Sequence, residues 1–187
     1  SGRGYDYTVD WGDGTTDNNV TGNVTHTYVT PGVYTVSIDG DFPRFFMANR
    51  GDKLKLKSIE QWGDIVWTNM DQSFDGCSNM LINAIDAPNL SSVIYSRAMF
   101  RGCTNIGTPD LTNWDVSTLQ DVWGMFLQSN FNGDVSNWNT SSMTSMINMF
   151  ASSEFNGDVN SWNVSVALDM GSLFNNCPFN QPLNNWD

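Results

Sequence analysis

The chain has 187 residues, with 8 Lys and Arg against 20 Asp and Glu, and a formal net charge of −12 at pH 7. A surface that binds nucleic acid or anionic lipid needs clustered cations, and none occurs from residue 102 to the end of the sequence. We therefore expect no nucleic-acid partner, and because no run of apolar residues is long enough to cross a bilayer, we expect no membrane insertion.

Apolar side chains alternate with polar ones in the first part of the chain, as they do in half-buried strands. The alternation occupies residues 5–11 and residues 34–38, and each run lies next to a turn sequence that contains glycine. We expect a small antiparallel β unit here.

Three motifs of this region follow one another in the order and spacing of a known domain: VDWGDGT at 9–15, THTY at 25–28 and PGVYTV at 31–36. Together they resemble the second half of a PKD (polycystic kidney disease) domain. The resemblance implies a PKD-like β-sandwich unit, which we place at residues 1–50.

A repeat of 24 to 26 residues begins near Leu54. One position of the repeat is Trp in five of six copies: Trp62, Pro88, Trp114, Trp138, Trp162 and Trp186. Twelve residues after each of the first five comes a phenylalanine: Phe74, Phe100, Phe126, Phe150 and Phe174. A unit of this length cannot bury an apolar face alone, so the copies must stack, about 5 Å apart. We interpret both series as structural packing ladders; a Trp platform that stacks sugar rings is the alternative.

The repeat also resembles a known family through the blocks SFDGCSNM at 73–80, MFRGCTNI at 99–106, NWDVS at 113–117 and NWNTS at 137–141. They resemble the BspA-like leucine-rich repeat, in the variant shared with mycoplasma-type surface lipoproteins. The resemblance implies a leucine-rich-repeat solenoid of about five coils at residues 51–187, mainly β with short helices or turns. It also implies a bacterial protein that is secreted or held at the cell surface, with a binding or adhesion role.

Cysteines share one phase of the repeat, three residues after the phenylalanine. Cys77 and Cys103 should therefore lie on neighbouring copies, close enough for a disulfide. Ser129 and Ser153 take the same position in later copies, which favours a slot for any small side chain and reduced thiols in the core.

Catalytic chemistry has few candidates in this sequence. His26 is the only histidine, so neither a Ser/His/Asp nor a Cys/His arrangement can form, and the cysteines lack zinc-site pairing. We expect no enzyme, no cofactor and no specific metal site. Weak calcium binding by the acidic turn with Asp10, Asp13 and Asp17 stays open.

The best candidates for binding occupy positions that the repeat leaves variable, five and three residues before each phenylalanine. On a strand, such positions face outward together. In two neighbouring copies they are Tyr95, Arg97, Asp121 and Trp123, which predicts a mixed aromatic and charged patch. We expect a monomer whose patch contacts a protein or glycan on a cell or matrix surface. The alternatives are a structural spacer that projects another domain and a carbohydrate-binding accessory to an enzyme.

Overall fold

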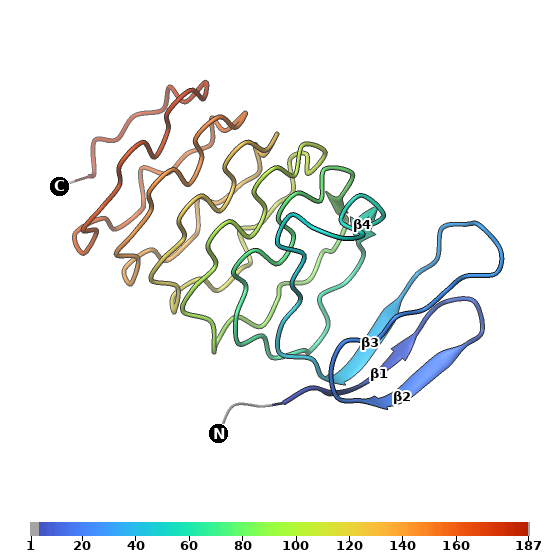
Figure 1. The fold of residues 1–187 in the computed structure, drawn as a ribbon. Helices are drawn as coiled ribbons and strands as arrows, with labels where there is room; N and C mark the ends of the chain where they lie inside the picture. Colours follow the sequence, from blue (N-terminus) through green and yellow to red (C-terminus); the bar gives the residue numbers. More distant parts are fainter. Residues whose placement is uncertain (1–3, 187) are drawn as a thin grey trace. The chain divides into compact units, whose positions relative to one another are not determined.

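A computed structural model describes residues 4–186, and the chain divides between Pro43 and Arg44 into two compact units (Figure 1). None of the described residues lies in a helix. The part of the chain that the structure describes thus contains no helix that could cross a membrane.

The first unit is built on one antiparallel sheet of three strands. They are β1 (Asp6–Asp10), β2 (Thr16–Val20) and β3 (Ser37–Asp41), in the order β2-β1-β3. Tyr7 and Val9 of β1 are buried, as the alternation predicts. Gly12 lies in the turn after β1 with φ +76°, and a Cβ there would come within 2.4 Å of the Thr35 carbonyl oxygen, so the turn requires glycine.

Ring contacts join the rest of the first unit. Trp11 stacks on His26 at 4.8 Å between ring centroids, His26 meets Tyr28 edge-on at 4.6 Å, and Tyr28 stacks on Tyr34 at 4.2 Å. Of the run at 34–38, only its last two residues belong to a strand, because Tyr34 takes part in this aromatic row instead. The strand β2 is polar and lacks apolar alternation, so the sequence pattern does not predict it.

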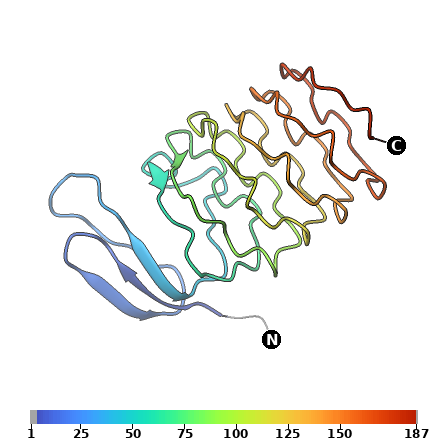
Figure 2. The ribbon, with the colours of Figure 1, turned by 180° about the vertical axis from the view of Figure 1, so that it is seen from behind.

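The second unit consists of the repeat copies, which lie side by side in chain order (Figures 1 and 2). We call each copy a row and number its residues from the phenylalanine as position 0. The backbone N–H groups at positions −4, −2, 0 and +2 donate to carbonyls of the following row. In one junction, Ala98 N donates to Trp123 O at 2.8 Å and Phe100 N to Met125 O at 2.8 Å. These bonds link the rows in parallel register.

Within each row, the N–H groups at position +1, and in most rows those at −1 and +3, close overlapping β-turns. Met125 N donates to Val122 O at 3.0 Å and Leu127 N to Gly124 O at 3.1 Å. The residues at positions −2 and +2 have φ between +50° and +76° in every row: Gln72, Ala98, Gly124, Asn148, Ser172, Gly76, Gly102, Gln128, Ser152 and Asn176. A left-handed residue on each side of the phenylalanine prevents an extended strand there.

The expectation of a leucine-rich-repeat solenoid with short helices, preceded by a β-sandwich, is therefore wrong. In the first unit, the described residues form a single sheet rather than two packed sheets. In the second, regular strands are confined to the parallel pair β4 (Ser58–Ile59) and β5 (Leu81–Ile82), and the other described rows share isolated bridges. Neighbouring rows are hydrogen-bonded as parallel β-strands are. Within each row, however, successive β-turns take the place of the continuous strands and short helices that the resemblance implies.

The core of the second unit is a set of aromatic stacks. Phe126 lies between Phe100 and Phe150, with 5.6 Å between ring centroids on each side. Trp138 and Trp162 stack at 6.1 Å, whereas Trp62 and Trp114 meet at 90°, across the row that has Pro88. Most members of the two series are buried; Phe174 and Trp186, at the C-terminal end, are half-buried.

Residues 44–50 pack in the second unit, although the sequence pattern places them with the first. Phe45 stacks on Phe74 at 5.2 Å, and the backbone N–H of Met47 donates to Ser73 O at 3.1 Å. This segment therefore covers the first row of the phenylalanine stack.

Candidate functional site

The single histidine is held in a structural arrangement. His26 Nε2 lies 2.8 Å from Asp13 Oδ2 while the His26 ring stacks on Trp11. The hydroxyl and N–H of Thr15 donate to the other oxygen of Asp13, at 2.6 and 3.0 Å. The Thr15 hydroxyl bond, followed by the His26 bond, lowers the pKa of Asp13 to about 2.

The acidic turn considered for calcium uses its carboxylates internally. Asp10 accepts from Gly12 N at 2.8 Å, and Asp17 accepts from the indole N–H of Trp11 at 2.9 Å. Across residues 4–186, no group of three or more His, Cys, Asp or Glu side chains is placed to hold a metal ion.

The cysteines are free thiols, and the fold removes two of the three from solvent. Cys77 and Cys103 are fully buried, and Cys103 Sγ donates to Phe74 O at 3.1 Å. Burial raises the pKa of Cys77 to about 12 and also raises the pKa of Cys103. Because a thiolate is the nucleophile, neither side chain is suited to covalent chemistry.

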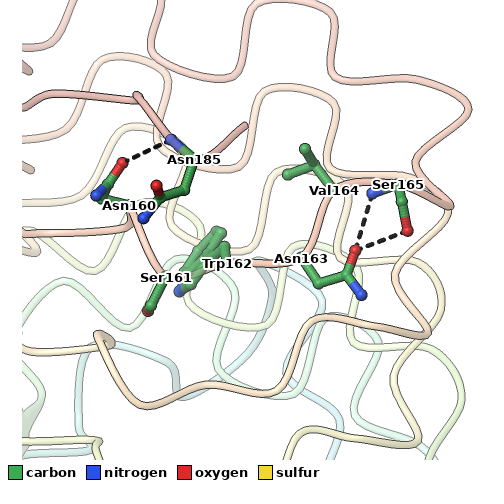
Figure 3. Close-up of a pocket in the computed structure, with 7 residues that line it drawn as sticks. All are labelled: Asn160, Ser161, Trp162, Asn163, Val164, Ser165 and Asn185. Carbon is green, nitrogen blue, oxygen red and sulfur yellow. Dashed lines mark hydrogen bonds between the residues drawn. The ribbon is translucent and has the colours of Figure 1, made fainter. Parts of the chain in front are cut away.

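A pocket of about 300 Å³ lies near the C-terminal end of the second unit (Figure 3). Asn163 Oδ1 accepts from the N–H and the hydroxyl of Ser165, at 3.0 and 2.7 Å. Asn139 and Asn89 make the same turn in earlier rows. The pocket wall is therefore a regular part of the repeat rather than a special site.

The four residues of the predicted patch lie in two adjacent rows. Tyr95 and Asp121 form a parallel bridge. Arg97 Nε donates to Asp121 Oδ2 at 2.8 Å, and the guanidinium carbon of Arg97 lies 4.6 Å from the centroid of the Tyr95 ring. Trp123 N donates to Asp121 Oδ1 at 3.0 Å. Direct contacts therefore connect Tyr95 to Arg97, Arg97 to Asp121, and Asp121 to Trp123. We call these four residues the Tyr95–Trp123 face.

This face is accessible and partly rigid. Tyr95 is 41% exposed, the side chain of Arg97 is 45% exposed, and Trp123 is half-buried. The hydrogen bond that Arg97 donates to the Asp121 carboxylate raises the pKa of Arg97, which stays charged. In the described part of the chain, the Trp123 indole has neither a ring partner nor an acceptor for its N–H. This tryptophan thus differs from Trp138 and Trp162, whose indoles are stacked and hydrogen-bonded.

Neighbouring rows extend the face beyond the four predicted residues, through Asp71 and Ile147. Asp71 Oδ1 accepts from the backbone N–H of Arg97 at 2.8 Å, and Arg44 Nη2 donates to the Asp71 carbonyl at 3.1 Å. On the other side, Gly124 N donates to Ile147 O at 2.9 Å, which brings half-buried Ile147 to the position after Trp123 in the stack. The alignment of the repeat places both Asp71 and Ile147 at position −3, the position of Arg97 and Trp123.

The sequence analysis missed a second charge pair. Arg101 binds Asp75 through two nitrogen atoms, with Nε 2.9 Å from Oδ1, and the Asp75 side chain is 1% exposed. Both residues occupy position +1 of adjacent rows. The pair links two rows, and the bidentate contact from half-exposed Arg101 satisfies both oxygens of the buried Asp75 carboxylate.

Comparison with known proteins gives one family. A family model described as "Mycoplasma protein of unknown function, DUF285" matches residues 41–130 and residues 97–187. Together the matches cover more than half of the chain, which belongs to this family, and the family indicates a bacterial protein. No curated protein and no solved structure matches the chain.

Proposed function

We propose that this protein is a non-catalytic binding module that acts outside a bacterial cell, at its surface or after secretion. The Tyr95–Trp123 face would contact a protein or glycan on a cell or matrix surface. The observation that carries this proposal is the fixed placement of Arg97, held by Asp121 and Tyr95 in an exposed position on stacked rows.

Preorganisation supports this role. Tyr, Trp and Arg are the side chains most enriched among binding hot spots, and here three of them stand where the repeat requires no core residue. The charge contacts already hold Arg97, so less side-chain entropy is lost when a ligand binds. The resemblance of the sequence to BspA-like surface repeats and to a PKD domain supports an extracellular setting.

Attachment of the fluorescently labelled chain to cultured epithelial cells tests this proposal. The double variant Tyr95→Ala/Trp123→Ala should reduce attachment at least about tenfold, which corresponds to the loss of one hot-spot contact. Ile85→Ala is the matched control, because Ile85 is also apolar, is 95% exposed and lies in another loop of the same unit. Circular dichroism should show that both variants keep their fold.

Two results would contradict the proposal. One is attachment no stronger than that of an equally acidic control protein, which a purely structural spacer would show. The other is specific attachment that the double variant leaves unchanged, which would move the binding site to another surface.

A further inference from the structure

We infer that the Tyr95–Trp123 face recognises an uncharged oligosaccharide. This inference rests on the proposed binding function and names the class of ligand. Three features of the face point to it: the balance of four charged groups, the polar atoms that have no partner, and two aromatic rings.

The charges of the face cancel locally. Asp71 and Asp121 carry two negative charges, and Arg97 and Arg44 carry two positive charges. Both oxygens of Asp121 are engaged, one by Arg97 Nε and the other by Trp123 N. An anionic ligand would meet no excess of positive charge and would approach a chain of net charge −12. A cationic ligand would find both oxygens of the Asp121 carboxylate already hydrogen-bonded. The balance therefore favours a ligand without charge.

The unused polar atoms fit hydroxyl groups. Within residues 4–186, the Tyr95 hydroxyl, the Trp123 indole N–H and the terminal nitrogens of Arg97 have no hydrogen-bond partner. The second carboxylate oxygen of Asp71 is a further acceptor. A sugar hydroxyl both donates and accepts, so one ligand can use all of these groups. A purely apolar ligand would leave them unpaired at a cost.

The aromatic rings suit the faces of sugar rings. One face of the Tyr95 ring is covered by the Arg97 guanidinium, and the residue as a whole is 41% exposed. Trp123 lies in the next row, about 5 Å further along the stack, and two residues after Asp121, the bridge partner of Tyr95. A short linear oligosaccharide can therefore contact both rings. Tyr and Trp each combine an apolar ring with a polar tip. A sugar likewise combines an apolar C–H face with polar hydroxyl groups.

A protein partner is the less favoured occupant. Stable protein interfaces bury about 800 Å² on each side around an apolar core that is depleted of charge. Here the two rings are surrounded by charged groups, and Ile94 is the exposed aliphatic neighbour. The face is thus small and polar for a protein, and well matched to a few sugar units.

An array of immobilised glycans, probed with the labelled full chain, tests the inference. We expect binding to one or more uncharged glycans and none to sulfated or carboxylated ones. The affinity for the bound glycan, measured by calorimetry, should fall at least about tenfold in Trp123→Ala and in Tyr95→Ala. Ile85→Ala should leave it unchanged. In the NMR spectrum, the indole N–H signal that disappears in Trp123→Phe should shift when the glycan is added to the unsubstituted chain.

Binding confined to acidic glycans, or neutral-glycan binding that these variants leave unchanged, would overturn the inference. Cell attachment separates this failure from failure of the proposed function. Attachment that requires Tyr95 and Trp123, survives periodate oxidation of the cell glycans and is lost after protease treatment would keep the binding function and assign a protein ligand instead. Attachment that does not depend on the two rings would overturn both proposals.

Discussion

The indole of Trp162 stacks on the indole of Trp138 with 6.1 Å between ring centroids and 3° between ring planes. Each indole N–H also donates to a backbone carbonyl of the preceding row, Trp138 to Leu111 O at 2.8 Å and Trp162 to Val135 O at 3.1 Å. The stack therefore joins consecutive rows by apolar contact and by hydrogen bonds together. Trp138 is 3% exposed, so its ring offers no free face to a ligand.

Replacing Trp138 with alanine should lower the free energy of unfolding by about 3–5 kcal/mol, because a large buried ring and its hydrogen bond are lost. Trp123→Ala is the matched control. Its ring is half-buried and makes no ring contact within the described chain, so its loss should cost less than about 1 kcal/mol. Urea unfolding followed by circular dichroism gives both values. Equal losses in the two variants would contradict the division into a structural and a surface tryptophan.

Two glycines should respond differently to alanine. A Cβ at Gly133 would lie 2.2 Å from Pro109 O in the adjacent row and 2.7 Å from the Phe131 ring, and the carbonyl cannot rotate away. Gly133→Ala should therefore separate two rows locally and cost at least about 3 kcal/mol.

A Cβ at Gly102 would be 3.6 Å from its nearest neighbour, so Gly102→Ala should cost only the backbone strain of φ +68°, about 1–2 kcal/mol. Ala98 already tolerates φ +50° in the same row. Thermal unfolding of both variants compares them directly, and a larger loss for Gly102→Ala would show that backbone strain outweighs the close approach of rows.

The carboxyl group of Asp13 should titrate at about pH 2 in the folded protein, below its usual pKa of 3.8. Because the folded pKa is the lower one, the contribution of this group to stability is present above about pH 4 and is lost as the pH falls toward 2. Carbon NMR of the Asp13 side chain follows the titration. Thr15→Val removes the largest cause and should move the midpoint upward. A midpoint near 3.8 in the unsubstituted protein would show that the Thr15 and His26 bonds do not persist in solution.

Iodoacetamide should distinguish the three cysteines at pH 8. Cys77 and Cys103 should stay unmodified in the folded protein, because both are fully buried and burial raises the pKa of each thiol. Cys177 is half-buried and its pKa is raised less, so it should react first. Mass spectrometry of peptides, with denatured protein as the control, locates the modified sites. A peptide pair that joins Cys77 to Cys103 would instead reveal a disulfide.

The repeat itself could be predicted from the sequence because burial imposes a fixed identity at a fixed interval. The phenylalanine series and the small residues three positions later are set by the width of the core, which is the same in every row. The Tyr95–Trp123 face followed from the same alignment, since residues at positions −5 and −3 escape that constraint. The direct contacts among its members agree with the expected proximity, although their path runs over turns rather than along a strand.

Tertiary structure alone decided the backbone conformation of the rows. Only three of the ten left-handed positions are glycine, and residues such as Gln72 and Ala98 have no local preference for positive φ. They adopt it because their N–H groups must point toward carbonyls of the next row, which lies 24 to 26 residues away. Hydrogen bonding between rows thus outweighed the strand pattern read along a single row. The sequence by itself therefore determined which side chains of each row are buried. The hydrogen bonds between rows determined that the backbone carrying these side chains forms turns rather than a strand.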